Sequence, residues 1–215
     1  MKKYWFFVTV LAIMFLLKTE AFCQSNFILA GETSGSNTAY TDLIPDIRII
    51  NYYNCSSNWF FDIDKDDNYD FKFKSSSAQS PGGVYKKDYT IVTSGSKFIA
   101  IHPSSSQCAD VINANDTIGE NLTWGTSAIL WYYNFVPGGT PSELGYWHNV
   151  ENKYLGLKKV AGNDTIYCWL QLYVTGNYIH FREFATSHQL TKTNGCNAKI
   201  IDGAELTPAK DSKFQ

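Results

Sequence analysis

Residues 153–184 read KYLGLKKVAGNDTIYCWLQLYVTGNYIHFREF, and this stretch decides the fold class. Between residues 165 and 174, the apolar side chains of Ile166 and Leu170 alternate with those of Tyr167 and Trp169, which is the period of a β-strand. Gly-Asn-Asp before this segment and Thr-Gly-Asn after it are typical turn residues. The stretch therefore predicts three antiparallel strands, at residues 153–160, 165–174 and 178–184.

The rest of the chain repeats this pattern of short aromatic and β-branched segments separated by Gly, Ser, Asn, Asp and Pro. Further strands are expected at residues 27–30, 46–53, 58–63, 69–75, 88–93, 97–102 and 128–135. Residues 105–113 permit a short helix, because Cys108, Val111 and Ile112 recur at helical offsets. We therefore predict an all-β protein, an antiparallel β-sandwich or jelly roll of about ten short strands.

The first 23 residues have the features of a secretory signal peptide. Lys2 and Lys3 precede an apolar run that is too short to span a bilayer comfortably, and Ala21 and Cys23 are small residues suited to cleavage before Gln24. Lipidation of Cys23 is the alternative. The sequence thus predicts a signal peptide at 1–23, a secreted or periplasmic/outer-surface location, and no transmembrane span in the mature chain.

Residues 24–215 have the length of a single β domain. Removing residues 1–23 takes away three lysines and one glutamate, which leaves 15 basic and 19 acidic residues and a net charge of −4. No basic stripe is present, so nucleic acid is not an expected partner.

Residues 62–70 read DIDKDDNYD and predict a calcium site. Alternate residues of a turning loop point the same way, so the carboxylates of Asp62, Asp64, Asp66 and Asp70 can converge with the backbone carbonyl of Asn68 on one hard cation. The loop is not an EF-hand, because Asp stands at the sixth position, where an EF-hand has Gly. The alternative is a solvated acidic turn between two strands.

The strand at 165–174 predicts one face in the core and one aromatic face that includes Trp169 and Tyr173. Another sheet or loop covers that face in one interpretation. In the other, Trp169 and Tyr173 are ligand-binding residues that stack on a sugar ring or contact a partner.

The mature chain has four cysteines, Cys55, Cys108, Cys168 and Cys196. An even number in a secreted chain makes disulfides an expectation, but four cysteines allow three pairings and the spacing does not choose between them. Cys168 shares a face with Ile166 and Leu170, so it also fits a buried apolar position.

The segments YW at 146–147, KYLGL at 153–157 and IYCWLQL at 166–172, together with the aspartate loop, resemble small secreted proteins of Bacteroidota. The chain departs from that pattern at Cys168 and Asp67, where Gly is usual. The resemblance implies an extracytoplasmic β-sandwich of uncharacterised function.

No catalytic motif for nucleophilic, metal-dependent or phosphate chemistry occurs in the sequence. We therefore predict a non-catalytic protein with a structural calcium site. The alternative is a carbohydrate-binding module or surface adhesin, with a glycan or cell-surface component as partner.

Overall fold

The computed structural model describes residues 27–35, 38–51, 54–162 and 164–187. Within these residues the chain forms thirteen strands in three sheets and no helix, which confirms the all-β prediction with three more strands than expected. The predicted signal peptide, its cleavage site at Cys23 and Gln24, and Cys196 lie outside the described residues.

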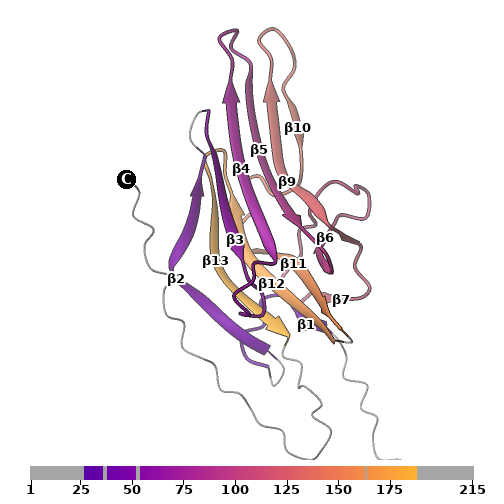
Figure 1. The fold of residues 1–215 in the computed structure, drawn as a ribbon. Coiled ribbons are helices and arrows are strands. Elements are labelled where there is room, and N and C mark those ends of the chain that lie inside the picture. The colour runs from indigo at the N-terminus through magenta and orange to yellow at the C-terminus, as the bar shows by residue number, and fades with distance from the viewer. Residues whose placement is uncertain (1–26, 36–37, 52–53, 163, 188–215) are drawn as a thin grey trace, which may run out of the picture.

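One layer is a five-stranded antiparallel sheet (Figure 1). In sheet order its strands are β10 (Ser142–Leu144), β9 (Ser127–Phe135), β5 (Tyr85–Thr93), β4 (Phe71–Gln79) and β3 (Ser56–Phe61). Side chains of β4 alternate between buried and partly exposed over its first seven residues, as expected for a strand with one face in a core. The hairpins β4–β5 and β9–β10 extend past the turn between β12 and β13.

The other layer is a six-stranded sheet that contains the predicted meander. Its strands in order are β2 (Thr38–Ile50), β13 (Tyr178–Ser187), β12 (Asp164–Val174), β11 (Lys153–Ala161), β6 (Lys97–Ala100) and β8 (Trp124–Gly125). Strands β11, β12 and β13 pair antiparallel in sequence order, so this part of the prediction is confirmed.

The main core lies between these two sheets. Phe73, Tyr89 and Ile91 from the five-stranded sheet are fully buried in one cluster with Leu170 and Phe181 from the six-stranded sheet. This two-layer arrangement is that of a β-sandwich.

A second core lies on the opposite face of the six-stranded sheet. The short pair β1 (Phe27–Leu29) and β7 (Thr117–Gly119) packs there against β12. Ile28 and Ile118 from this pair are buried with Tyr167 and Trp169 of β12. Strand β12 is therefore buried on both faces along most of its length.

Three of the strands, β7, β8 and β10, were missed by the sequence analysis, because two or three residues do not establish a period. The short helix that the spacing permits at residues 105–113 does not form. Cys108 and Ile112 are buried there through isolated bridges to Ile129 and Tyr154, so their spacing reflects strand-like pairing and not a helical face.

Candidate metal centre

The aspartate loop joins β3 to β4 at the end of the five-stranded sheet. Phe61 pairs with Phe71 as the last rung of this hairpin, and the Asp70 amide donates to the Phe61 carbonyl at 2.9 Å. Both phenylalanines and Ile63 are buried, so apolar contacts fix the loop at its two ends and at one point within it.

Asp62 organises the backbone of the loop. Its Oδ1 accepts hydrogen bonds from the amides of Asp64 (3.2 Å) and Lys65 (2.8 Å), and its Oδ2 accepts one from the amide of Asp67 (2.8 Å). Bonds of this kind hold a tight turn in the manner of an Asx-turn. The first carboxylate therefore shapes the loop in addition to facing its interior.

Asp67 takes the conformation that a glycine would take at its position. Its φ is 65°, in the left-handed region, and that of Lys65 is 57°. Aspartate is one of the residues that enter this region most readily, because its short side chain bonds locally. The lack of the glycine that an EF-hand has at this position therefore does not prevent the turn.

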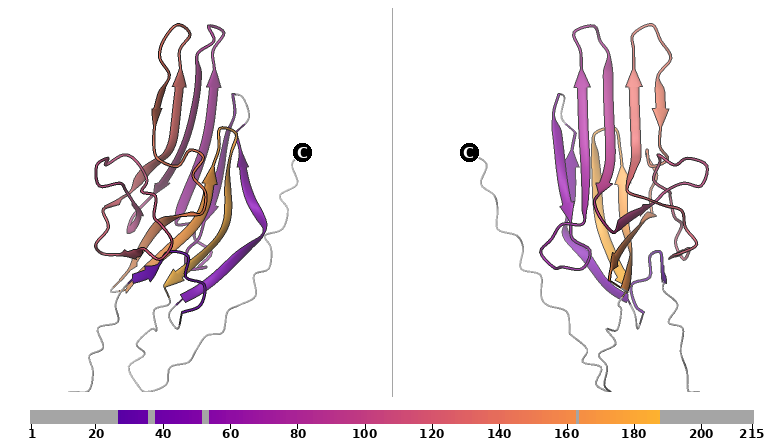
Figure 2. Two further views of the ribbon diagram at one scale, coloured as in Figure 1. Left: turned by 180° about the vertical axis from the view of Figure 1, so that it is seen from behind. Right: turned by 45° about the vertical axis from the view of Figure 1, so that its right-hand side comes forward.

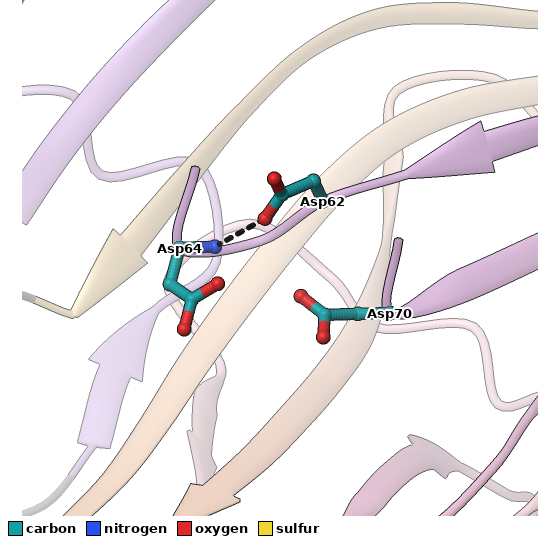
Figure 3. Close-up of side chains that lie close together, drawn as sticks. All are labelled: Asp62, Asp64 and Asp70. Carbon is teal, nitrogen blue, oxygen red and sulfur yellow. Dashed lines mark hydrogen bonds between the residues drawn. The ribbon is translucent and has the colours of Figure 1, made fainter. Parts of the chain in front are cut away.

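Three of the predicted ligands converge. One carboxylate oxygen from each of Asp62, Asp64 and Asp70 lies within 4.8 Å of the others (Figure 3). The Asp70 side chain is fully buried, and its Oδ2 accepts the amide of Ile63 at 2.9 Å. The sequence prediction of a carboxylate cluster is thus confirmed for these three residues.

Asp66 and Asn68 lie beside this group. Asp66 Oδ1 accepts a hydrogen bond from the amide of Asn68 at 2.8 Å. The side chain of Asp66 is exposed and does not belong to the cluster of three. That Asn68 supplies a carbonyl ligand stays a prediction.

Two lysines that the sequence analysis did not consider enter the cluster from the other sheet. Lys159 Nζ lies 2.7 Å from a carboxylate oxygen of Asp64, 3.3 Å from Asp66 and 3.0 Å from Asp70 Oδ1. Lys97 Nζ lies 3.3 Å from the same oxygen of Asp70. The cluster is therefore a cross-sheet ion-pair network, which joins the β3–β4 loop to β6 and β11.

The two lysines face each other directly on neighbouring strands, in the register pair Lys159↔Lys97. They share this face with the buried pair Leu157↔Ile99, so both ammonium groups point toward the sandwich interior. Like charges opposite each other destabilise a strand pair unless counter-charges compensate. Lysine at an inward strand position was the signal in the sequence for a buried acidic partner.

The charges of this network do not balance. Asp62, Asp64, Asp66 and Asp70 supply four carboxylates against the two ammonium groups of Lys97 and Lys159, which leaves two negative charges uncompensated when all are ionised. An excess of two negative charges over the network, three of whose four carboxylates converge, matches a divalent cation.

The pKa values follow from these contacts. Burial raises the pKa of Asp62, as does its hydrogen bond with Asp64, against the lowering effect of the loop amides. The pKa of Asp66 is lowered, first by the Asn68 amide. Burial alone lowers the pKa of Lys159, but hydrogen bonds to Asp64 and Asp70 outweigh it and raise the pKa overall. Lys159 is therefore a firmly charged member of the network.

The predicted ligand-binding ring of Trp169 is not at the surface. Trp169 is fully buried in the second core, edge-on to Tyr154 at 5.2 Å between centroids. The covered face is thus the correct interpretation for Trp169, and a stacking surface there is wrong. Tyr173 is partly exposed beside Tyr178, with ring centroids 6.4 Å apart.

Cys55, Cys108 and Cys168 are free thiols, so no disulfide joins these three described cysteines. Cys55 is exposed, whereas Cys108 and Cys168 are buried. Burial raises the pKa of Cys168 well above its ordinary value, which keeps it a thiol inside the main core. Its prediction as a buried apolar residue is confirmed.

These positions predict the reactivity of the thiols. In a Cys196→Ser variant without residues 1–23, we expect a thiol-specific colorimetric reagent to modify one cysteine in the native state and three in guanidinium without reductant, because only an accessible thiolate reacts. Fewer than three modified cysteines in guanidinium would reveal a disulfide. Two or more modified cysteines in the native state would contradict the burial of Cys108 and Cys168.

No protein-family model, curated protein or solved structure matches the chain. The resemblance to small secreted proteins of Bacteroidota accordingly stays a prediction. Over the residues that the structure describes, no helix has the length and apolar character needed to cross a membrane.

Proposed function

We propose that this chain is a secreted, non-catalytic β-sandwich protein in which the Asp62–Asp70 loop binds a calcium ion as a structural element. One observation carries the proposal: Asp62, Asp64 and Asp70 converge in a loop that keeps two uncompensated negative charges beside Lys97 and Lys159. The two lysines offset the self-repulsion of the loop only in part, and a divalent cation would offset the remainder.

Calcium suits this group of oxygens better than magnesium does. Calcium accepts six to eight oxygen ligands in flexible geometry, whereas magnesium demands a near-ideal octahedron and retains several waters. The loop offers carboxylates from Asp62, Asp64, Asp66 and Asp70 and the carbonyl of Asn68, all within nine consecutive residues. Bound there, the ion would stabilise the β3–β4 connection by direct bonds to its carboxylates.

Lys159 makes binding a competition. Its ammonium group already contacts Asp64, Asp66 and Asp70, so an incoming cation must share these oxygens with it or displace it. The affinity for calcium is therefore expected to rise when the charge of Lys159 is removed.

The test is thermal unfolding of the chain without residues 1–23, in EDTA and in millimolar calcium. At a calcium concentration of about 100 times Kd, a site confined to the folded state adds roughly 2.7 kcal/mol, or about 5–10 °C for a chain of this size. Magnesium at the same concentration is expected to give a smaller shift.

Asp64→Asn is the informative variant, because it keeps the shape of the side chain and removes a ligand charge. Asp88→Asn is its control, since Asp88 lies on β5 of the same sheet and outside the loop. We expect the calcium shift to disappear in Asp64→Asn and to persist in Asp88→Asn. An unchanged melting temperature in the wild-type protein would refute the calcium site.

A further inference from the structure

The five-stranded sheet has one face in the core and the other open. On β4, Phe71 and Phe73 are buried, whereas Lys72 and Lys74 between and after them are partly exposed. The small sheet of β1 and β7 packs against the six-stranded sheet, so among the described strands neither covers this face. Figure 2, right, shows β4, β5, β9 and β10 side by side in this layer.

The open face carries positive charge. The cross-strand pairs Lys72↔Val92, Lys74↔Thr90 and Ala78↔Lys86 place three lysines on it, and Ser76↔Asp88 adds one carboxylate. Directly paired residues share a face of a sheet, so the outward charges on the strands sum to +2. The whole chain has a net charge of −2, which makes this face a basic surface on an acidic protein.

Aromatic rings lie beside these lysines. Lys72 Nζ is 5.3 Å from the centroid of Phe60, and Lys86 Nζ is 5.2 Å from the centroid of Tyr132. Phe60 is 44% exposed and contacts Tyr69, which is 66% exposed, at 5.2 Å between centroids. The face thus presents two sites where a flat apolar ring adjoins a positive charge.

The two sites are far enough apart to require an extended ligand. Phe60 on β3 pairs with Lys72 of β4. Tyr132 on β9 pairs with Asp88 of β5, which pairs with Ser76 of β4. The two rings are therefore three strands apart across the sheet and four residues apart along the strands. With strands about 4.8 Å apart and a rise of about 3.3 Å per residue, the separation is roughly 20 Å. That distance exceeds a single sugar or amino acid.

The chemistry of the face indicates the class of ligand. Lysine is depleted in protein–protein interfaces, so a lysine-rich sheet face is a poor protein interface. Nucleic-acid-binding domains are usually strongly basic, whereas this chain has a pI of about 6.1. A polymeric ligand that combines spaced negative charges with apolar ring faces fits both the lysines and the aromatic rings of this surface.

We propose that the open face of the five-stranded sheet binds an acidic polysaccharide. Lys72, Lys74 and Lys86 pair with its carboxylate or sulfate groups, and Phe60 and Tyr132 contact the apolar faces of its sugar rings. The site adjoins the aspartate loop at Tyr69 but uses none of the loop carboxylates, so binding should not require calcium.

Binding is tested with the chain without residues 1–23, in EDTA, against polygalacturonate, dextran sulfate and uncharged dextran. We expect binding to one or both anionic polymers and none to dextran, and we expect the affinity to fall as salt screens the charges. A stronger response to polygalacturonate or to dextran sulfate distinguishes carboxylate from sulfate recognition. No binding to either anionic polymer would overturn the proposal.

Matched variants locate the site. Lys72→Gln with Lys86→Gln should weaken binding about tenfold, the effect of losing two exposed ion pairs of about 0.7 kcal/mol each. Lys65→Gln with Lys153→Gln gives the same net charge but changes the loop and the other sheet, and it should have little effect. Equal losses in the two double variants would overturn the proposal.

The aromatic variant separates ring contact from attraction by charge alone, and single-stranded DNA separates a polysaccharide from a polyanion whose bases also stack on aromatic rings. Tyr132→Ala keeps the net charge and should weaken binding several-fold, whereas Tyr173→Ala on the six-stranded sheet should not. A single-stranded DNA of similar charge that binds as tightly as the polysaccharide, or an unaffected Tyr132→Ala, would overturn the proposal. Asp64→Asn should bind the polymer normally, so failure of the calcium site and failure of this face are distinguishable.

Discussion

Replacing Lys159 by Met is expected to lower the free energy of unfolding by about 3–5 kcal/mol in EDTA, because it removes one partner of a buried ion pair. The Asp70 side chain is fully buried, and without Lys159 the remaining ion-pair partner of its Oδ1 among the described residues is Lys97, at 3.3 Å. Methionine keeps most of the length of the lysine side chain, so the loss is mainly one of charge.

Calcium should reverse much of this loss. With Lys159 gone, Asp64, Asp66 and Asp70 lose their shared ammonium, and a divalent cation can take its place among the same oxygens. Denaturant unfolding in EDTA and in calcium measures the difference. We expect calcium to stabilise Lys159→Met more than it stabilises the wild-type protein.

Lys153→Met is the matched control for this experiment. Lys153 lies on the same strand, but its Nζ donates to the side-chain carbonyl of Asn113 at 2.6 Å and pairs with no carboxylate in the described residues. Lys153→Met should lower the free energy of unfolding by less than about 1 kcal/mol, as substitutions at the surface usually do. If Lys159→Met costs no more than this control, the network does not stabilise the fold. If calcium has the same effect on wild type and Lys159→Met, the cation does not bind at the network.

The local parts of this site were predictable from the sequence, and the non-local parts were not. Asp62, Asp64 and Asp70 are near neighbours in one loop, so their spacing alone indicates convergence. Lys159 follows the loop by about ninety residues and reaches it only because β11 pairs with β6 across from the β3–β4 hairpin. The local pattern of apolar and polar residues does not show which strand of one sheet lies opposite a loop of the other, so the contact of Lys159 with the aspartate loop could not be predicted.

The fold shows the same limit. The period of two in residues 165–174 was sufficient to predict β12 and its neighbours in the meander. Whether the second face of β12 is covered depends on β1 and β7, which pair between Phe27 and Gly119, far apart in the chain. Both strands are three residues long, which is too short for a sequence pattern to predict that a second core forms there.

The second core leads to a large expected effect at Trp169. We expect Trp169→Ala to lower the free energy of unfolding by about 3–5 kcal/mol, the usual cost of truncating a buried large aromatic residue. Trp169 is fully buried against Tyr154, Tyr167 and the residues of β1 and β7. The measurement is denaturant unfolding in saturating calcium, so that the aspartate loop is in the same state in every variant.

Tyr173→Ala is the control, because Tyr173 lies on the same strand and is partly exposed. It should cost about 1 kcal/mol or less, as expected near the surface. Trp169→Phe should cost less than Trp169→Ala, since it refills much of the cavity and removes an indole N–H that has no hydrogen-bond partner among the described residues. A Trp169→Ala variant as stable as Tyr173→Ala, with impaired binding to a glycan, would instead place Trp169 on a ligand surface and contradict the second core.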